Sequence, residues 1–207
     1  MSTISIGIVG ERHPHELKEL SDSLAEIIND KPQQERILGL AGPNEVVQLL
    51  IDAVTWKNAL YSLALILGGK FAASFATELG KLTATKIWKE KKNYHEAFKK
   101  IISSPFHRFV NAIKALRTKN QTILITIKIP GTIRNASLAL ISDDPAEIAW
   151  QIANVIRCAE DIKDIVEAAK KTNPNENFLD RNNPDMSVVI EVLDNGDVKV
   201  FDVIIKK

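Results

Sequence analysis

The chain has 207 residues, of which 45% are hydrophobic and 26% are charged, and its 27 basic and 26 acidic side chains give a net charge of +1. This composition is that of a globular protein and excludes the collagen-like, wholly disordered and multi-span membrane classes. The single cysteine, Cys158, excludes a disulfide framework and a zinc ribbon built from cysteines. Because residues 1–5 show no basic stretch followed by an apolar run, we expect a cytoplasmic location, with membrane association as an alternative.

The N-terminal part of the chain predicts a strand, a helix and a second strand. Isoleucines alternate with smaller residues over 4–8, which is typical of a β-strand. Pro14 suits the first turn of a helix, and leucine and isoleucine recur at helical spacing over 17–28. A second short strand is predicted over 36–41.

The middle of the chain predicts helices. From Glu45 to Trp88 the sequence is mostly apolar, with polar side chains confined to a narrow stripe, as in a helix that is covered on most sides. Two adjacent glycines at 68–69 are expected to divide or bend this stretch, because glycine weakens a helix interior by about 1 kcal/mol. A third helix is predicted over 94–116, with Pro105 as a kink or a break.

The C-terminal part returns to strands on both sides of one helix. A β-branched strand over 121–129 is expected to form a hairpin with 136–141. A long amphipathic helix follows over 144–169, with an aspartate cap and a proline in its first turn. The last strands, 188–193 and 198–205, are expected to form a second hairpin.

These elements predict an α+β protein. Its sheet is expected to be mixed or antiparallel and to come from the N- and C-terminal parts, with a helical middle of three helices over about 45–116. We expect a single domain over 1–207, in which 44–117 is an inserted helical subdomain.

Six small residues follow one another at intervals of four in the middle of the chain. This spacing lets another helix approach closely. Because 3.6 residues make one turn, the six positions drift by about 40° at each step and cannot all face one straight partner. Close packing of two helices inside a soluble core gives the same pattern. The residues are Ala64, Gly68, Ala72, Ala76, Gly80 and Ala84.

Positive charge is concentrated over 81–134, which has 13 basic and 2 acidic side chains, whereas both flanking regions are net acidic. Such a block either binds an anionic partner or is a solvated face balanced by the acidic remainder. Nucleic acid is the less favoured partner, because no recognised nucleic-acid-binding motif is present. The basic surface is predicted to contain Lys86, Lys89, Lys91, Lys92, Lys99 and Lys100.

The apolar segment 58–79 has about the length that crosses a bilayer, and the basic run 81–100 follows it directly. Lys70 opposes a permanent span, because a lysine at the centre of a spanning helix costs about 2.5–3.5 kcal/mol. Insertion into an anionic membrane after a trigger is therefore an alternative to burial in a soluble core.

The loop over 10–15 is the best candidate for a ligand site. Glu11, Arg12 and His13 lie between a predicted strand and the start of a helix, where an anion is stabilised. The loop lacks the dinucleotide and phosphate-loop glycine patterns, so an ordinary connection to a helix that begins with a proline is the favoured explanation. The four histidines lack any familiar ligand spacing, and neither a metal nor another cofactor is expected.

The leading functional hypothesis is a non-catalytic interaction protein. It would self-associate or bind a protein partner through the apolar small-residue helices over 46–88. The alternatives are a membrane-acting effector that inserts 58–79, and a small ligand- or nucleotide-binding module that uses the loop 10–15. No catalytic residue is predicted, and an enzyme is less favoured than a binding protein.

Overall fold

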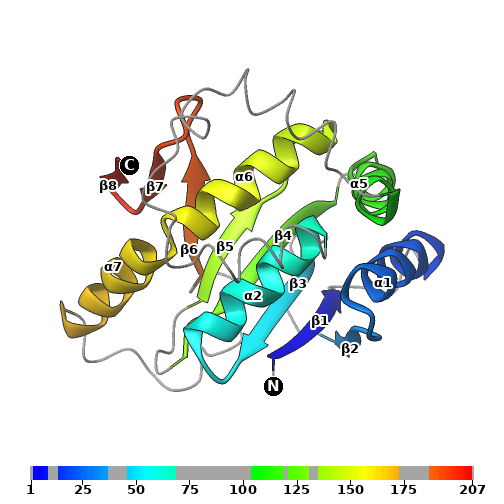
Figure 1. Ribbon diagram of the computed structural model, residues 1–207, viewed down its shortest axis with the longest axis horizontal. Coiled ribbons are helices and arrows are strands. Elements are labelled where there is room, and N and C mark those ends of the chain that lie inside the picture. The colour runs from blue at the N-terminus through cyan, green and yellow to red at the C-terminus, as the bar shows by residue number, and fades with distance from the viewer. Residues whose placement is uncertain are drawn as a thin grey trace.

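A computed structural model of the chain describes residues 2–8, 14–36, 46–68, 104–118, 121–130, 135–172 and 187–206. Within these ranges the chain forms one eight-stranded sheet and five helices (Figure 1). The sheet is mixed and takes strands from both ends of the chain. The predicted α+β class is therefore confirmed.

The elements and their order in the sheet are as follows. The strands are β1 (Ser2–Ile8), β2 (Gln33–Arg36), β3 (Val46–Ala53), β4 (Thr122–Lys128), β5 (Asn135–Ala139), β6 (Ser187–Val192), β7 (Val198–Val200) and β8 (Val203–Ile205). The helices are α1 (Pro14–Ile28), α2 (Trp56–Leu67), α5 (Ser104–Arg117), α6 (Pro145–Arg157) and α7 (Ala159–Thr172). The strand order is β2-β1-β3-β4-β5-β6-β7-β8. Three neighbouring pairs are parallel, β1 with β2, β3 with β4, and β5 with β6, and the other four are antiparallel.

The main correction concerns residues 46–53, which were predicted to begin a helix but form the internal strand β3. This strand pairs antiparallel with β1 and parallel with β4. Its consecutive residues Leu49, Leu50 and Ile51 are all buried, so both faces of the strand are covered. A strand covered on both faces is apolar without alternation, and periodicity does not separate such a run from a buried helix. The predicted helical subdomain 44–117 thus begins with a strand of the main sheet.

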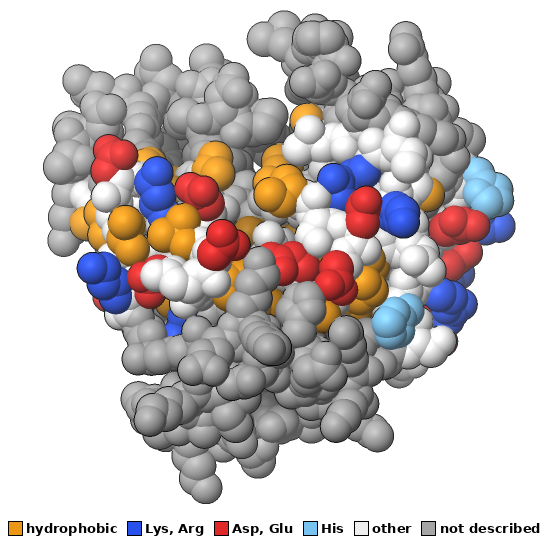
Figure 2. Space-filling view, turned by 90° about the horizontal axis from the view of Figure 1, so that it is seen from above, with side chains coloured by type: hydrophobic (Ala, Val, Ile, Leu, Met, Phe, Trp, Pro, Cys, Tyr) orange, Lys and Arg blue, Asp and Glu red, His pale blue; other side chains and the backbone are white. Residues whose placement is uncertain are grey.

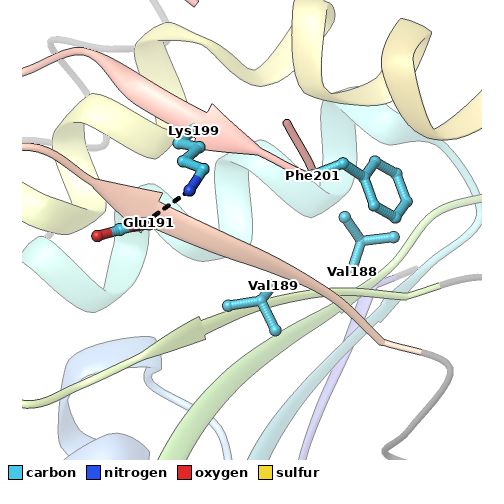
Figure 3. A pocket seen from close by; sticks show the side chains of 5 residues that line it. All are labelled: Val188, Val189, Glu191, Lys199 and Phe201. Atoms are coloured by element: carbon cyan, nitrogen blue, oxygen red, sulfur yellow. Dashed lines mark ion pairs between the residues drawn. The ribbon is translucent and has the colours of Figure 1, made fainter. Parts of the chain in front are cut away.

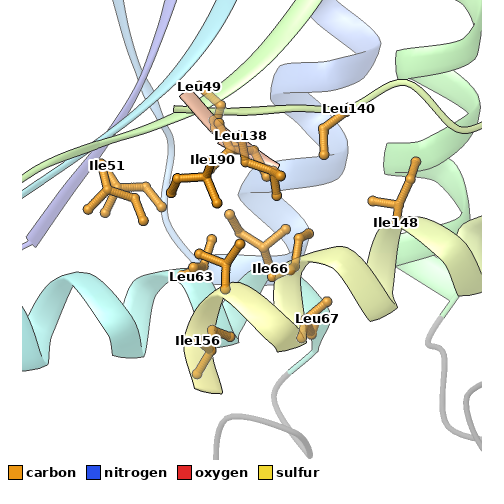
Figure 4. Close-up of a cluster of buried hydrophobic side chains, with 14 of the residues drawn as sticks. Leu49, Ile51, Leu63, Ile66, Leu67, Leu138, Leu140, Ile148, Ile156 and Ile190 are labelled. Atoms are coloured by element: carbon orange, nitrogen blue, oxygen red, sulfur yellow. The ribbon is translucent and has the colours of Figure 1, made fainter. Parts of the chain in front are cut away.

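A layer of helices covers one face of the sheet. Helices α2 and α6 lie side by side across it, and α1 packs against α5 (Figure 1). Figure 4 shows the core between the layers, where Leu63 and Ile66 of α2 and Ile148 of α6 lie opposite Leu49 and Leu138 of the sheet. All five side chains are buried.

The predictions of the first helix and of the β4–β5 pair are confirmed. The prediction of one long helix over 144–169 is wrong in one respect. The helix divides at the buried residue Cys158 into α6 and α7. The Cys158 N–H still donates to the Asn154 carbonyl at 3.0 Å, and its own carbonyl accepts from the Ile162 N–H at 2.9 Å. The apolar spacing therefore continues across the break and hides it in the sequence.

Two further points concern a proline and the last strand. Pro105 is the second residue of α5, where its missing N–H is tolerated, and the part of the predicted helix before Ser104 lies outside the described residues. The last predicted strand, 198–205, is divided into β7 and β8 by a two-residue turn at Phe201 and Asp202. Asp202 is a common turn residue, but Phe201 is not, and a single aspartate between β-branched residues does not predict a reversal.

Candidate interaction surface

Most residues that the sequence analysis selected as sites lie outside the described ranges. This holds for the loop 10–13, for four members of the small-residue series, and for all six lysines of the basic surface. The residues concerned are Glu11, Arg12, His13, Ala72, Ala76, Gly80, Ala84, Lys86, Lys89, Lys91, Lys92, Lys99 and Lys100.

The two described members of the small-residue series have roles inside the fold. Ala64 is fully buried in the core face of α2. Gly68 ends α2 with φ 122° and ψ 150°, and its N–H donates to the Leu65 carbonyl at 2.9 Å. This backbone conformation is nearly exclusive to glycine, so Gly68 is explained by the helix end. The predicted association segment covers 46–88. Its described part, 46–68, consists of β3 and α2 and forms part of the core.

The described side chains bear on metal binding and on membrane insertion. His15 and His107 are exposed, and within the described ranges no group of three or more histidine, cysteine, aspartate or glutamate residues lies close enough to hold a metal ion. Cys158 is fully buried, as expected for a small core residue. Among the described helices, none has both the length and the apolar character that crossing a bilayer requires.

Strands β6, β7 and β8 present a different feature, which follows from their alternation. The side chains that face the helices are buried, as Ile190 and Val200 show. On the opposite face the register brings Glu191, Lys199 and Ile204 into one row across the three strands. Val189 shares this face with Glu191, because side chains two residues apart point the same way.

Four large apolar side chains at these strands remain exposed, and we call them the C-terminal apolar surface. Val189 and Ile204 lie on the face away from the helices, Val203 lies on the other face, and Phe201 lies in the turn between β7 and β8. The exposed fractions are 67% for Val189, 42% for Phe201, 48% for Val203 and 47% for Ile204. Figure 2 shows hydrophobic side chains reaching the surface between charged ones on the side of the molecule where Figure 1 places β7 and β8. Other exposed apolar side chains, such as Tyr61 on α2, lie on separate elements, and single cases of this kind are ordinary.

A hollow of about 320 Å³ lies beside this surface (Figure 3). Val188, Val189 and Phe201 supply its apolar lining. Glu191 and Lys199 line it as well, and the Lys199 Nζ lies 3.9 Å from the Glu191 Oε2. The hollow therefore combines an apolar floor with one balanced pair of charges.

The β6–β7 turn is fixed to helix α6. Arg157 Nη2 donates to the Gly196 carbonyl at 2.7 Å, and Gly196 itself is buried with φ 83°. A Cβ at this position would lie 3.3 Å from Asn154 Oδ1 and 3.6 Å from the Trp150 ring. The hairpin that bears the apolar surface is thus positioned by close contact between its turn and α6.

Phe201 has an unusual backbone conformation for an aromatic residue. Its φ is 53°, in the left-handed region that bulky side chains rarely adopt. In a two-residue turn this position favours glycine, asparagine or aspartate. The exposed ring of Phe201 lines the hollow.

This surface is not predicted above, although the sequence contains a signal for it. Val189 is two residues from the charged Glu191, and Ile204 is two residues from both Asp202 and Lys206. In a half-buried strand the charged residues mark the solvent face, so apolar residues that alternate in step with them are exposed.

Comparisons of the chain with family models, with curated proteins and with solved structures find no match.

Proposed function

We propose that the protein is a non-catalytic interaction protein that self-associates through the C-terminal apolar surface. The proposal depends on one observation, the presence of four large exposed apolar side chains on β6, on β8 and in the turn before β8. Burial of apolar area contributes about 25 cal/mol per Å², and exposed apolar patches mark interaction sites.

The chemistry of the surface favours a protein partner. Among the described residues at or beside it, Glu191 and Asp202 balance Lys199 and Lys206, so this part of the surface has no excess of positive charge with which to bind a polyanion. Polar residues around an apolar centre are typical of protein interfaces. The proposal moves the association site away from 46–68, which forms part of the core.

The test is the molar mass of the purified protein, measured by size-exclusion chromatography with light scattering over a range of concentrations. We expect the mass to rise with concentration. The double substitution Phe201→Ser with Ile204→Ser should raise the dissociation constant by at least about tenfold, since it removes two of the four apolar side chains.

Tyr61→Ser is the matched control, because Tyr61 is as exposed as Phe201 but lies on α2. It should leave the dissociation constant unchanged. A wild-type protein that is monomeric at every concentration would refute the proposal, and so would an equal effect of the control substitution.

A further inference from the structure

We infer that two copies of the chain associate by antiparallel pairing of their β8 strands, with Ile204 opposite the partner's Ile204 and Asp202 opposite the partner's Lys206. This inference rests on the proposed function and specifies its geometry. It joins the two sheets into one continuous sheet across a twofold axis at Ile204.

Strand β8 occupies the position in the sheet that such pairing requires. It is the last strand in the sheet order, and Figure 1 shows it at the margin beyond β7. In the part of the chain that the structure describes, no strand pairs with its outer side. An edge strand presents N–H and C=O groups that can bind another strand.

The turn before β8 determines which backbone groups point outward. Val200 and Val203 flank the two-residue turn and face each other across the β7–β8 pair. The C=O of Val200 accepts from the N–H of Val203 in such a turn, so the backbone of Val203 faces β7. Since these groups alternate in direction along an antiparallel strand, the N–H and C=O of Ile204 point to the open edge. Asp202 lies in the turn and Lys206 follows the strand, and each shares a peptide group with a residue of β8. The C=O of Asp202 and the N–H of Lys206 therefore also point to the open edge, opposite to the Val203 N–H and the Ile205 C=O.

Charge then selects one register among those that the backbone permits. Sliding by one residue would place inward groups opposite outward ones, so only even shifts are compatible. A shift by two residues puts Asp202 or Lys206 opposite the partner's Ile204, and a shift by four puts like charges opposite each other. The inferred register is the one in which both Asp202 and Lys206 face opposite charges, and both residues are exposed.

The same register covers apolar side chains on both faces of the sheet. Ile204 lies on the face away from the helices, where it would contact the partner's Ile204. Val203, on the other face and 48% exposed, would lie opposite the partner's Ile205. Directly opposite side chains in an antiparallel pair are close enough to interact, and opposite charges there are favourable whereas like charges are not.

The test uses charge exchange between two single variants, Asp202→Lys and Lys206→Asp. Each variant alone should associate at least about tenfold more weakly than wild type, because like charges then face each other twice in the homodimer. An equimolar mixture of the two should form a heterodimer, in which every facing pair has opposite charges. The double variant Asp202→Lys with Lys206→Asp should recover wild-type association. Native mass spectrometry identifies the heterodimer, and circular dichroism confirms that each variant is folded.

Tyr61→Lys is the control for adding a charge at an exposed apolar position. Tyr61 lies on α2, away from the inferred interface, so this variant should still dimerise. Single variants that dimerise as wild type does, and that show no preference for each other in the mixture, would overturn the inferred register. If Phe201→Ser with Ile204→Ser still weakened association in that case, the proposed function would stand without edge pairing. A wild-type protein that is always monomeric would refute both, and Asp202 and Lys206 would then protect the edge from pairing.

Discussion

The backbone conformation of Gly196 helps to position the hairpin that bears the candidate surface. The Gly196 φ of 83° lies in the left-handed region, and Gly196 packs against Asn154 and Trp150 of α6. Because Arg157 also binds its carbonyl, the turn between β6 and β7 has little freedom to shift. The place of the apolar surface relative to the helices therefore depends on one residue without a side chain.

Gly196→Ala should lower the free energy of unfolding by about 1–3 kcal/mol, because a Cβ is disfavoured at this φ and would press on Asn154. Urea denaturation followed by circular dichroism measures the change. An unfolding midpoint equal to that of wild type would show that the turn does not need this conformation.

At the scale of elements, polar side chains lie at the buried centre of the sheet. Thr126 on β4 and Ser137 on β5 face each other, and both are at most 2% exposed. Their hydroxyl oxygens are 2.9 Å apart and form a hydrogen bond. They lie on the face opposite to Ile125 and Leu138, so this face of the strand pair is also removed from water.

Thr126→Val should destabilise the protein by about 1–3 kcal/mol, because it leaves the buried Ser137 hydroxyl without its partner. Ser137→Ala should have a similar effect for the same reason. The double variant should be more stable than the sum of the two changes implies, since it removes both polar groups together. Thermal and chemical unfolding of the four proteins completes the cycle, and strict additivity would contradict this role of the pair.

The elements that the sequence predicted correctly are those with a clear local signal. The helix after Pro14 and the β4–β5 hairpin have an unambiguous period and recognisable ends. Strand β3 was predicted as helix because both of its faces are buried, which removes the alternation. The turn at Phe201 was missed because the residue adopts a conformation that its type disfavours. The candidate surface could not be predicted because the exposure of side chains on β8 depends on which strand lies at the edge of the sheet. The order of the strands is not visible in the local sequence.

At the scale of the whole molecule, α2 is a central part of the core. Leu63 and Ile66 are at most 1% exposed between the sheet and the helical layer. Insertion of 58–79 into a membrane would therefore withdraw α2 from the core and expose the apolar side of the sheet. This cost sets a high threshold for any trigger of the membrane alternative.

Leu63→Ala should reduce the free energy of unfolding by about 2–5 kcal/mol, because it opens a cavity in a packed interior. Tyr61→Ala, two residues earlier on the same helix, should cost at most about 0.5 kcal/mol, because the side chain is 43% exposed. Chemical denaturation of both variants gives the comparison. Equal costs would mean that α2 does not pack on the sheet as described.

The order of the strands also has a consequence for synthesis. Strand β2 pairs with one side of β1, and β3 pairs with the other side. From β3 onward, each described strand lies beside a strand that precedes it in the chain. A nascent polypeptide leaving the ribosome can thus extend the sheet in one direction, adding each strand to a margin that already exists. On this route β8 is the final strand to be added, and the β8 margin is complete only when translation has passed Ile205.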